Sequence, residues 1–405
     1  MNRIAEQYVK LVLAVGEHDA DYVDAYYGPG DWRSEVRSYR KPLSTLESEA
    51  SSLLAELGTF DTSNAEEPVR LRKLYLTKQL QSLLTRVQIL QGTKLSFDEE
   101  AKALYDAEPP TRSVQQFEEI LRQIDIVLAG KGTLIQRYEV YKKKFIIPIE
   151  QLDRVFSAAI DECRARAKKH IELPPAESFK VEYVRNKSWS GYNWYKGNSY
   201  SVIQVNTDLP IYIDRAVDLA AHEGYPGHHV YNALLEETMV KNRKWVEFSV
   251  YPLFSPQSLI AEGTANFGIE VAFPGKERIE FEHHVLFPLA RLDPSSAEQY
   301  YKLSDLVSKL SYAGNEAARR YLDGLCSKEE AISWLTNYAL MPRERAEQRV
   351  RFFEQYRSYV INYNVGLDLV RRYIERRGGT PDNPIKRWKE FEQLLSSPRV
   401  PSALR

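Results

Sequence analysis

The chain has 405 residues, of which 43% are hydrophobic and 27% are charged, and its formal net charge is −1. It is long enough for one large core or two packed lobes, and near-neutrality excludes a global attraction to nucleic acid or to anionic membranes. The two cysteines, Cys163 and Cys326, form no C-x-x-C pattern, which excludes a disulfide framework and a thiolate metal site.

No signal or membrane-spanning segment is evident. The first residues, 1–7, contain no apolar signal core, and no stretch approaches the roughly 20 apolar residues that cross a bilayer. We therefore expect a cytoplasmic protein with no nucleic-acid or membrane partner. The sequence does not indicate the oligomeric state.

The first 170 residues or so carry the pattern of helices. Apolar residues recur at helical spacing in 3–16, 43–57 and 69–91, and capping-box patterns follow at Ser96 with Glu99 and at Ser113 with Gln116. None of these helices carries a cluster of charged or histidine residues that indicates chemistry. We therefore predict that residues 1–175 form an N-terminal helical scaffold.

The pattern changes after a predicted helix at 149–170. Residues 178–184 and 199–206 are rich in β-branched and aromatic side chains and are bounded by turn residues, which predicts a small sheet of about three strands. Because 199–206 directly precedes the histidine motif described below, we expect it at the edge of the sheet, where it could bind an extended peptide by strand addition. Asn206 would then close one end of the site as a substrate-binding residue.

Helical patterns dominate the remainder of the chain. The predicted ranges are 213–237 with an interruption, 256–272, 276–291, 296–323, 327–339, 343–377 and 384–395.

Three of the seven histidines fall within eight residues, at His222, His228 and His229, and Glu223 follows the first. A His-Glu pair that ends an amphipathic helix is the first half of the zincin signature H-E-x-x-H, in which two histidines bind zinc and the glutamate activates water. In an unbroken helix, residues six positions apart are rotated by about 600° about the helix axis, so the side chains of His222 and His228 would point in different directions. Pro226, together with Gly224 and Gly227, therefore predicts a bulge that returns His228 over His222.

The third ligand is expected on a following helix. Glu262 is favoured over Glu236, Glu237, Glu247 and Glu270 because its neighbours in Ala261–Phe267 are mostly small, as close helix packing requires. Two histidines and one glutamate leave an open position, which is typical of a catalytic rather than a structural zinc site. Glu270, two turns later, is a candidate to support a ligand.

The block His222-Glu223-x-Tyr-Pro-Gly-His228-His229, followed by Glu262-Gly263, resembles the bacterial family called domain of unknown function 885, which is placed among the zincin-like metallopeptidases. Gly227-His228-His229 also looks like the second half of the H-E-x-G-H motif of thimet-type and thermostable-carboxypeptidase-type oligopeptidases. This resemblance implies that His228, not His229, is the second ligand. Residues 356–366 are similar to the closing Tyr-Lys-x-Gly motif of the family, although Asn364 stands in place of lysine. The resemblance covers roughly residues 178–375.

Together these patterns predict a mainly α, zincin-like helical fold with a small β-sheet next to the active-site helix, the catalytic part being 176–405. Glu223 is the predicted general base, and Tyr363, Arg357 and His229 are candidates to stabilise the tetrahedral intermediate. Arg357 could instead bind a substrate carboxylate or form an ordinary salt bridge, and Tyr363 could simply pack. His229 is also a candidate for substrate binding.

The predicted function is zinc-dependent (Zn²⁺) hydrolysis of peptide bonds, by a peptidase of oligopeptidase or carboxypeptidase type. Two alternatives stay open: a zinc hydrolase of a non-peptide amide or ester, and a non-catalytic helical protein that keeps a metal site. An intact Glu223 argues against the second, because a purely structural site has no need of a base.

Overall fold

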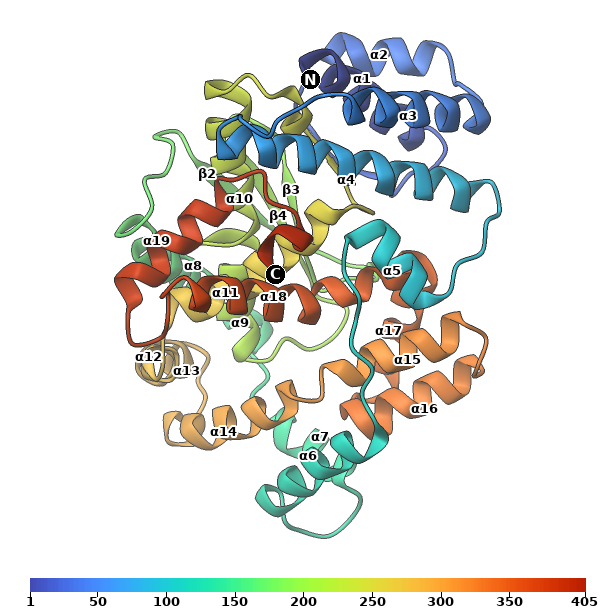
Figure 1. The fold of residues 1–405 in the computed structure, drawn as a ribbon. Helices are drawn as coiled ribbons and strands as arrows, with labels where there is room; N and C mark the ends of the chain where they lie inside the picture. The colour runs from blue at the N-terminus through green and yellow to red at the C-terminus, as the bar shows by residue number, and fades with distance from the viewer.

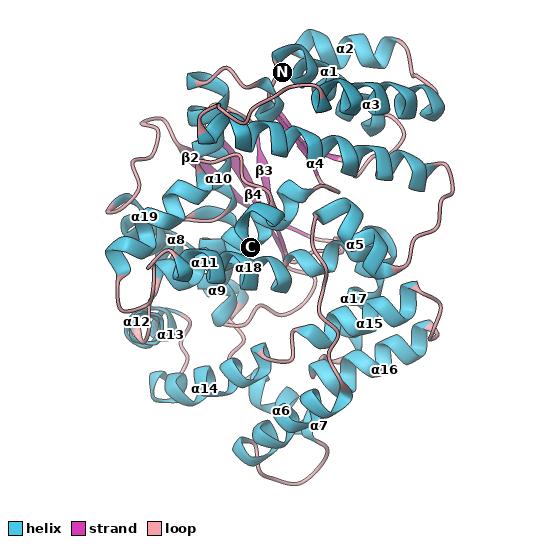
Figure 2. Ribbon diagram, viewed as in Figure 1, coloured by secondary structure: helices cyan, strands magenta, loops and turns pink.

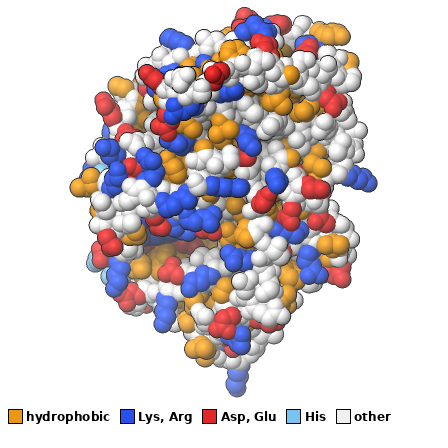
Figure 3. Space-filling model, in the orientation of Figure 1, with side chains coloured by type: hydrophobic (Ala, Val, Ile, Leu, Met, Phe, Trp, Pro, Cys, Tyr) orange, Lys and Arg blue, Asp and Glu red, His pale blue; other side chains and the backbone are white.

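The computed structural model describes residues 1–405 and is mainly α-helical, with two small sheets among the helices (Figures 1 and 2). The predicted fold class, mainly α with a small sheet next to the histidine motif, is confirmed. No helix has both the length and the apolar character needed to cross a membrane. Acidic and basic side chains lie interspersed on the face seen in Figure 3.

The first part of the chain is helical, as predicted, and the Ser96 and Ser113 capping boxes begin two of its helices. In Figure 1 the long helix α4 crosses the upper part of the molecule, below the shorter helices α1 to α3. The helices of this part are α1 (Asn2–Gly16), α2 (Gly30–Ser38), α3 (Leu43–Gly58), α4 (Glu67–Leu90), α5 (Phe97–Tyr105), α6 (Val114–Val127), α7 (Leu134–Lys143), a 3₁₀ turn (Ile149–Gln151) and α8 (Leu152–Lys168).

A three-stranded sheet follows, with the order β2-β4-β3. Strand β4 (Tyr200–Asn206) pairs in parallel with β2 (Ser178–Val184) and antiparallel with β3 (Gly191–Tyr195). The expectation that 199–206 forms an edge strand is therefore wrong, because both sides of β4 are hydrogen-bonded. The short strand β3 takes the edge position that the sequence pattern assigned to its neighbour.

A second sheet joins distant parts of the chain. Strand β1 (Val23–Tyr26) pairs antiparallel with β5 (Val250–Pro252). Each is too short to show a clear alternation of apolar and polar residues, so neither is predicted from the sequence. Their pairing brings the N-terminal segment, including Asp24, to the region of the histidine motif.

The remaining elements agree with the predicted ranges except where long helices are divided. The helices are α9 (Asp214–Leu219), α10 (His228–Leu235), α11 (Pro256–Ala272), α12 (Glu277–Phe281), α13 (Phe287–Leu289), α14 (Ala297–Ser308), α15 (Tyr312–Leu322), α16 (Lys328–Ala339), α17 (Arg343–Tyr356), α18 (Asn364–Arg376) and α19 (Pro384–Leu395), with π-helical turns at Ala220–Gly224, Glu236–Asn242 and Glu282–Leu286 and 3₁₀ turns at Val246–Ser249, Pro294–Ser296, Arg357–Asn362 and Pro401–Leu404.

Two of the predicted helices are each two helices. Residues 296–323 form α14 and α15, and residues 343–377 form α17 and α18. The second division falls at Arg357, which adopts a positive φ of 51°, a conformation that ends a right-handed helix. The guanidinium of Arg357 donates to the buried carboxylate of Glu100, which holds the chain in this turn.

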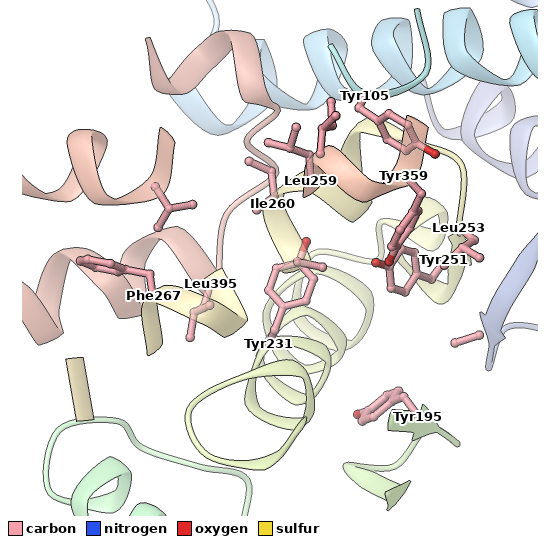
Figure 4. Close-up of a cluster of buried hydrophobic side chains, with 14 of the residues drawn as sticks. Tyr105, Tyr195, Tyr231, Tyr251, Leu253, Leu259, Ile260, Phe267, Tyr359 and Leu395 are labelled. Carbon is pink, nitrogen blue, oxygen red and sulfur yellow. The ribbon is translucent and has the colours of Figure 1, made fainter. Parts of the chain in front are cut away.

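A single cluster of 92 buried apolar residues extends from Ile4 to Leu404. Helix α11 lies inside it, and Figure 4 shows Leu259 and Ile260 of this helix among aromatic side chains that include Tyr231 and Tyr359. The division of the chain at residues 175 and 176 stays a prediction.

Candidate metal centre

The helix that carries His222 is interrupted after Gly224. Helix α9 continues into the π-helical turn Ala220–Gly224, and α10 begins at His228. Between them, the N–H of Gly227 donates to the carbonyl of Ala221 over 2.9 Å. A Cβ at Gly227 would lie 1.9 Å from the carbonyl oxygen of His222, so only glycine allows the chain to fold back this closely.

This interruption brings His222, His228 and Glu262 together. The Nε2 atoms of the two histidines are 3.1 Å apart, and Glu262 Oε2 lies 3.2 Å from His222 Nε2. Glu262 Oε1 lies 3.7 Å from His228 Nε2. Three ligand atoms that converge within 4.8 Å could hold a metal ion.

Asn266, one turn after Glu262 on α11, determines which nitrogen of His222 faces this cluster. The amide of Asn266 donates to the carbonyl of Tyr363 over 2.9 Å, so its Oδ1 is directed at Nδ1 of His222, 3.0 Å away. Since Oδ1 only accepts, Nδ1 carries the proton and Nε2 of a neutral His222 presents a lone pair to the cluster. This is the arrangement by which proteins orient a metal-binding histidine.

Two close contacts place Glu262. A Cβ at Gly263 would lie 2.5 Å from backbone atoms of Gly366, so α11 and α18 approach each other at these two glycines. The small residues after Glu262 thus serve packing against α18. The hydroxyl of Tyr359 donates to Glu262 Oε1 over 2.7 Å. Burial raises the pKa of Glu262, but the nearby imidazoles of His222 and His228 more than offset it, and the pKa falls well below its ordinary value.

Glu223 has a different environment from Glu262. It is 4% exposed, and its backbone carbonyl accepts a hydrogen bond from the Asn193 amide over 2.7 Å. Its Oε1 lies 2.9 Å from the position that a Cβ of Gly191 would occupy, so the edge strand β3 leaves room for the carboxylate. Burial raises the pKa of Glu223 to about 7, with His228 acting in the opposite direction. The pKa values of the two carboxyl groups of the site are therefore shifted in opposite directions.

A cavity of about 460 Å³ opens beside these residues. Its size lies within the range of small-molecule and cofactor sites. The cluster, Glu223 and Tyr363 line it together with the following residues from β1, β3, α9 and α17, among other elements: Asp24, Gly191, Tyr192, Asn193, Arg215, Asp218, Arg345, Gln348, Arg349, Phe352, Tyr356 and Tyr359.

The structure brings five of the predicted site residues to the cavity: His222, Glu223, His228, Glu262 and Tyr363. Tyr363 is half-buried near Glu262, and desolvation together with the charge of Glu262 raises its pKa well above the ordinary value.

Three predicted site residues do not line this cavity. His229 is fully buried, with Nδ1 2.8 Å from Ser201 Oγ and Nε2 3.2 Å from Glu177 Oε2. Asn206 donates to the carbonyls of Lys187 and Trp189 and so stabilises the loop before β3. Arg357 is paired with Glu100, which agrees with the salt-bridge alternative. Glu270 pairs with Arg371 and Arg387 and contacts no residue of the cluster.

Several residues of the site carry no signal in the sequence. Asn266 and Tyr359, which hydrogen-bond to the cluster, lie at helical positions typical of ordinary packing. Asp24, whose carboxylate accepts from Tyr192, reaches the cavity only through the pairing of β1 with β5. Helical spacing places Arg345 and Arg349 on one face of α17, but the sequence does not show what that face borders.

No protein-family model matches the chain, and no curated protein matches its sequence. Among solved structures, the protein is similar to a predicted lipoprotein from Colwellia psychrerythraea, with a TM-score of 0.55 and 15% identity over 94% of this chain and 79% of that one. A predicted lipoprotein of unknown function from Shewanella oneidensis aligns with a TM-score of 0.43 at 14% identity, over 90% and 75% of the two chains. An M32 carboxypeptidase from Deinococcus radiodurans aligns with a TM-score of 0.38 at 10% identity, over 98% and 90%. The first similarity indicates a shared fold, and the other two are too weak to support a conclusion.

Proposed function

We propose that the protein is a zinc-dependent hydrolase that cleaves amide bonds in peptides, and that it belongs to the family called domain of unknown function 885. The observation that carries the proposal is the convergence of His222, His228 and Glu262 beside the unpaired carboxylate of Glu223 in one cavity.

The donor set supports zinc in particular. Nitrogen and oxygen ligands about 2.0–2.1 Å from a tetrahedral zinc ion lie about 3.3 Å from one another. The two histidine nitrogens are 3.1 Å apart, and the Glu262 carboxylate lies 3.2 Å from His222 through Oε2 and 3.7 Å from His228 through Oε1. Glu262 Oε2, although buried, has no hydrogen-bond partner, so its lone pairs are available to a metal ion. Two histidines and one carboxylate also form a common ligand set of catalytic zinc.

A zinc ion held by these residues would supply a Lewis acid and a water nucleophile of lowered pKa. Glu223 would take the proton from the attacking water and return it to the leaving amine, since its carboxylate lines the cavity and forms no ion pair. Asn266 would keep His222 in the tautomer that binds the metal. Tyr363, on the same cavity wall, would donate a hydrogen bond to the developing oxyanion.

The test is hydrolysis of a peptide panel and a panel of small esters by the zinc-loaded protein, before and after chelation. We expect peptide cleavage that is lost on chelation and restored by zinc. Cleavage that survives complete removal of metal, or cleavage of esters alone, would contradict the proposal.

A pair of substitutions on α11 provides the matched control. Glu262→Gln removes an anionic ligand and should lower zinc occupancy and activity together. Glu270→Gln, two turns along the same helix, changes a partly exposed ion pair with Arg371 and should leave both unchanged.

A further inference from the structure

Two arginines on the wall of the cavity have no carboxylate partner. Arg345 and Arg349 lie four residues apart on α17, and both line the cavity. The Nε atom of Arg349 is buried without a hydrogen-bond partner. Arg345 donates only to the carbonyl of Pro210, over 3.0 Å. By contrast, Arg343 at the exposed start of the same helix pairs with Glu329 and Glu347.

This arrangement is unfavourable for the free protein. Burial lowers the pKa of both Arg345 and Arg349, and Arg215, which also lines the cavity, lowers that of Arg345 further. Like charges four residues apart on a helix repel each other, and a guanidinium nitrogen that is buried without a partner retains its desolvation cost. Asp218 does not compensate them, because Arg215 and Arg278 share its carboxylate. No carboxylate therefore forms an ion pair with Arg345 or Arg349, although the charge of Glu262 acts on Arg349 from a greater distance.

Arg349 is held in place by aromatic rings that connect it to the metal cluster. Its guanidinium lies 4.8 Å from the ring centre of Phe352 and 5.6 Å from that of Tyr363. The ring of Tyr363 lies 5.9 Å from that of Tyr359, whose hydroxyl donates to Glu262. These contacts fix the guanidinium on the same wall as Tyr363, so a substrate at the cluster and a group on Arg349 can be bound together.

We propose that Arg349 and Arg345 bind the C-terminal carboxylate of the peptide substrate, so that the protein cleaves near the C-terminus of peptides. This inference rests on the proposed function and specifies its substrate class. Two guanidinium groups on one helical face present the planar donors that bind a carboxylate through paired hydrogen bonds. The carboxylate would supply the ion-pair partner that the two guanidinium groups lack.

Binding is measured by titration calorimetry on the chelated, metal-free protein, so that the carboxylate cannot bind to zinc. Three probes are compared: a blocked tripeptide with a free C-terminal carboxylate, its C-terminal amide, and an amide of the same length whose last residue is Glu. We expect the free acid to bind about tenfold or more tightly than the amide, as a charge-assisted bidentate contact predicts. Arg349→Gln and Arg345→Gln should each reduce this ratio severalfold, and Arg343→Gln should leave it unchanged.

Arg349→Lys is a second variant that keeps the charge and removes the planar donor pair, so an intermediate ratio is expected. It also keeps the test decisive if Arg349→Gln does not fold. The proposal is overturned if the wild type binds acid and amide equally, or if the ratio survives in the Arg349 and Arg345 variants. Equal or tighter binding of the amide that ends in Glu would overturn the C-terminal assignment.

Hydrolysis separates this inference from the proposed function. Cleavage of acid and amide with equal kcat/KM would leave the hydrolase intact and remove the carboxylate site. Preferential binding of the acid without cleavage of any peptide would leave the carboxylate site and remove the hydrolase. A fall in kcat of Arg349→Gln that is the same for acid and amide would assign Arg349 to the reacting centre and overturn the inference.

Discussion

Gly227 lies directly against the carbonyl oxygen of His222, where a Cβ would approach to 1.9 Å. Because the obstructing atom belongs to the backbone, no rotation of a side chain relieves the contact. Gly227→Ala should therefore displace His228 from His222, abolish metal binding and lower the free energy of unfolding by a few kcal/mol, as overpacking does. Metal content by mass spectrometry and chemical denaturation measure the two effects.

Gly314 provides the control for this substitution. It lies inside α15, and a Cβ there would meet no atom within 4 Å. Gly314→Ala should keep full metal content and raise the unfolding free energy by about 0.4–1 kcal/mol. If Gly227→Ala behaved in the same way, the close approach would not be needed to form the cluster.

Asn266 is expected to tune metal affinity without being a ligand. Asn266→Ala frees the ring of His222 and removes the acceptor that fixes its tautomer, so affinity for zinc should fall about 10–100-fold. Competition with a chromogenic zinc chelator measures this change. Asn232→Ala is the comparison, because Asn232 lines the same cavity but donates only to the backbone carbonyl of His228. If Asn266→Ala and Asn232→Ala lowered the affinity for zinc equally, an effect of Asn266 through the imidazole of His222 would be contradicted.

The buried network around Glu177 predicts a pH-dependent stability. Burial raises the pKa of Glu177, but hydrogen bonds from His229, Tyr225 and Arg164 more than offset it and lower the pKa to about 2. The difference between a pKa of about 2 in the folded state and 4.5 in the unfolded state adds roughly 3 kcal/mol at most to the free energy of unfolding. This stabilisation is complete above pH 4.5 and is lost as the pH falls toward 2.

Glu177→Gln should accordingly destabilise the protein by up to about 3 kcal/mol near pH 7 and by much less near pH 2.5. Denaturation at a series of pH values measures the difference, and Glu172→Gln, at an exposed position, is the control. A destabilisation that does not change between pH 7 and pH 2.5 would show that the ionised form of Glu177 is not the stabilising one. The same network explains why His229, next to His228, is held away from the cavity.

Much of the cluster could be predicted because its residues lie close together in the sequence or have distinctive neighbours. His222, Glu223 and His228 lie within seven residues, and the residues between them predict the interruption that the structure contains. Glu262 could be favoured because small residues surround it. The amphipathic ranges of α1, α3, α4, α11 and α19 were also clear, since long periodic segments carry a strong signal.

What could not be predicted depends on partners that are distant in the chain. The sequence could not show that Arg357 forms a salt bridge, because its partner Glu100 lies 257 residues away. Arg357 therefore remained a candidate for substrate binding. Strand β4 was expected at an edge because β3, five residues long, has too weak a pattern to reveal that it covers β4. Arg349 has no local signal at all, because what distinguishes it is the lack of a partner in three dimensions.

The most direct test of the central claim compares zinc content and peptide hydrolysis in the wild type and in Glu223→Gln. This change removes the base but leaves His222, His228 and Glu262 in place. We expect one zinc ion per chain in both proteins and a fall in kcat of about 10²–10⁴-fold in the variant. Absence of zinc from both proteins, or equal hydrolysis by both, would contradict a zinc site served by Glu223.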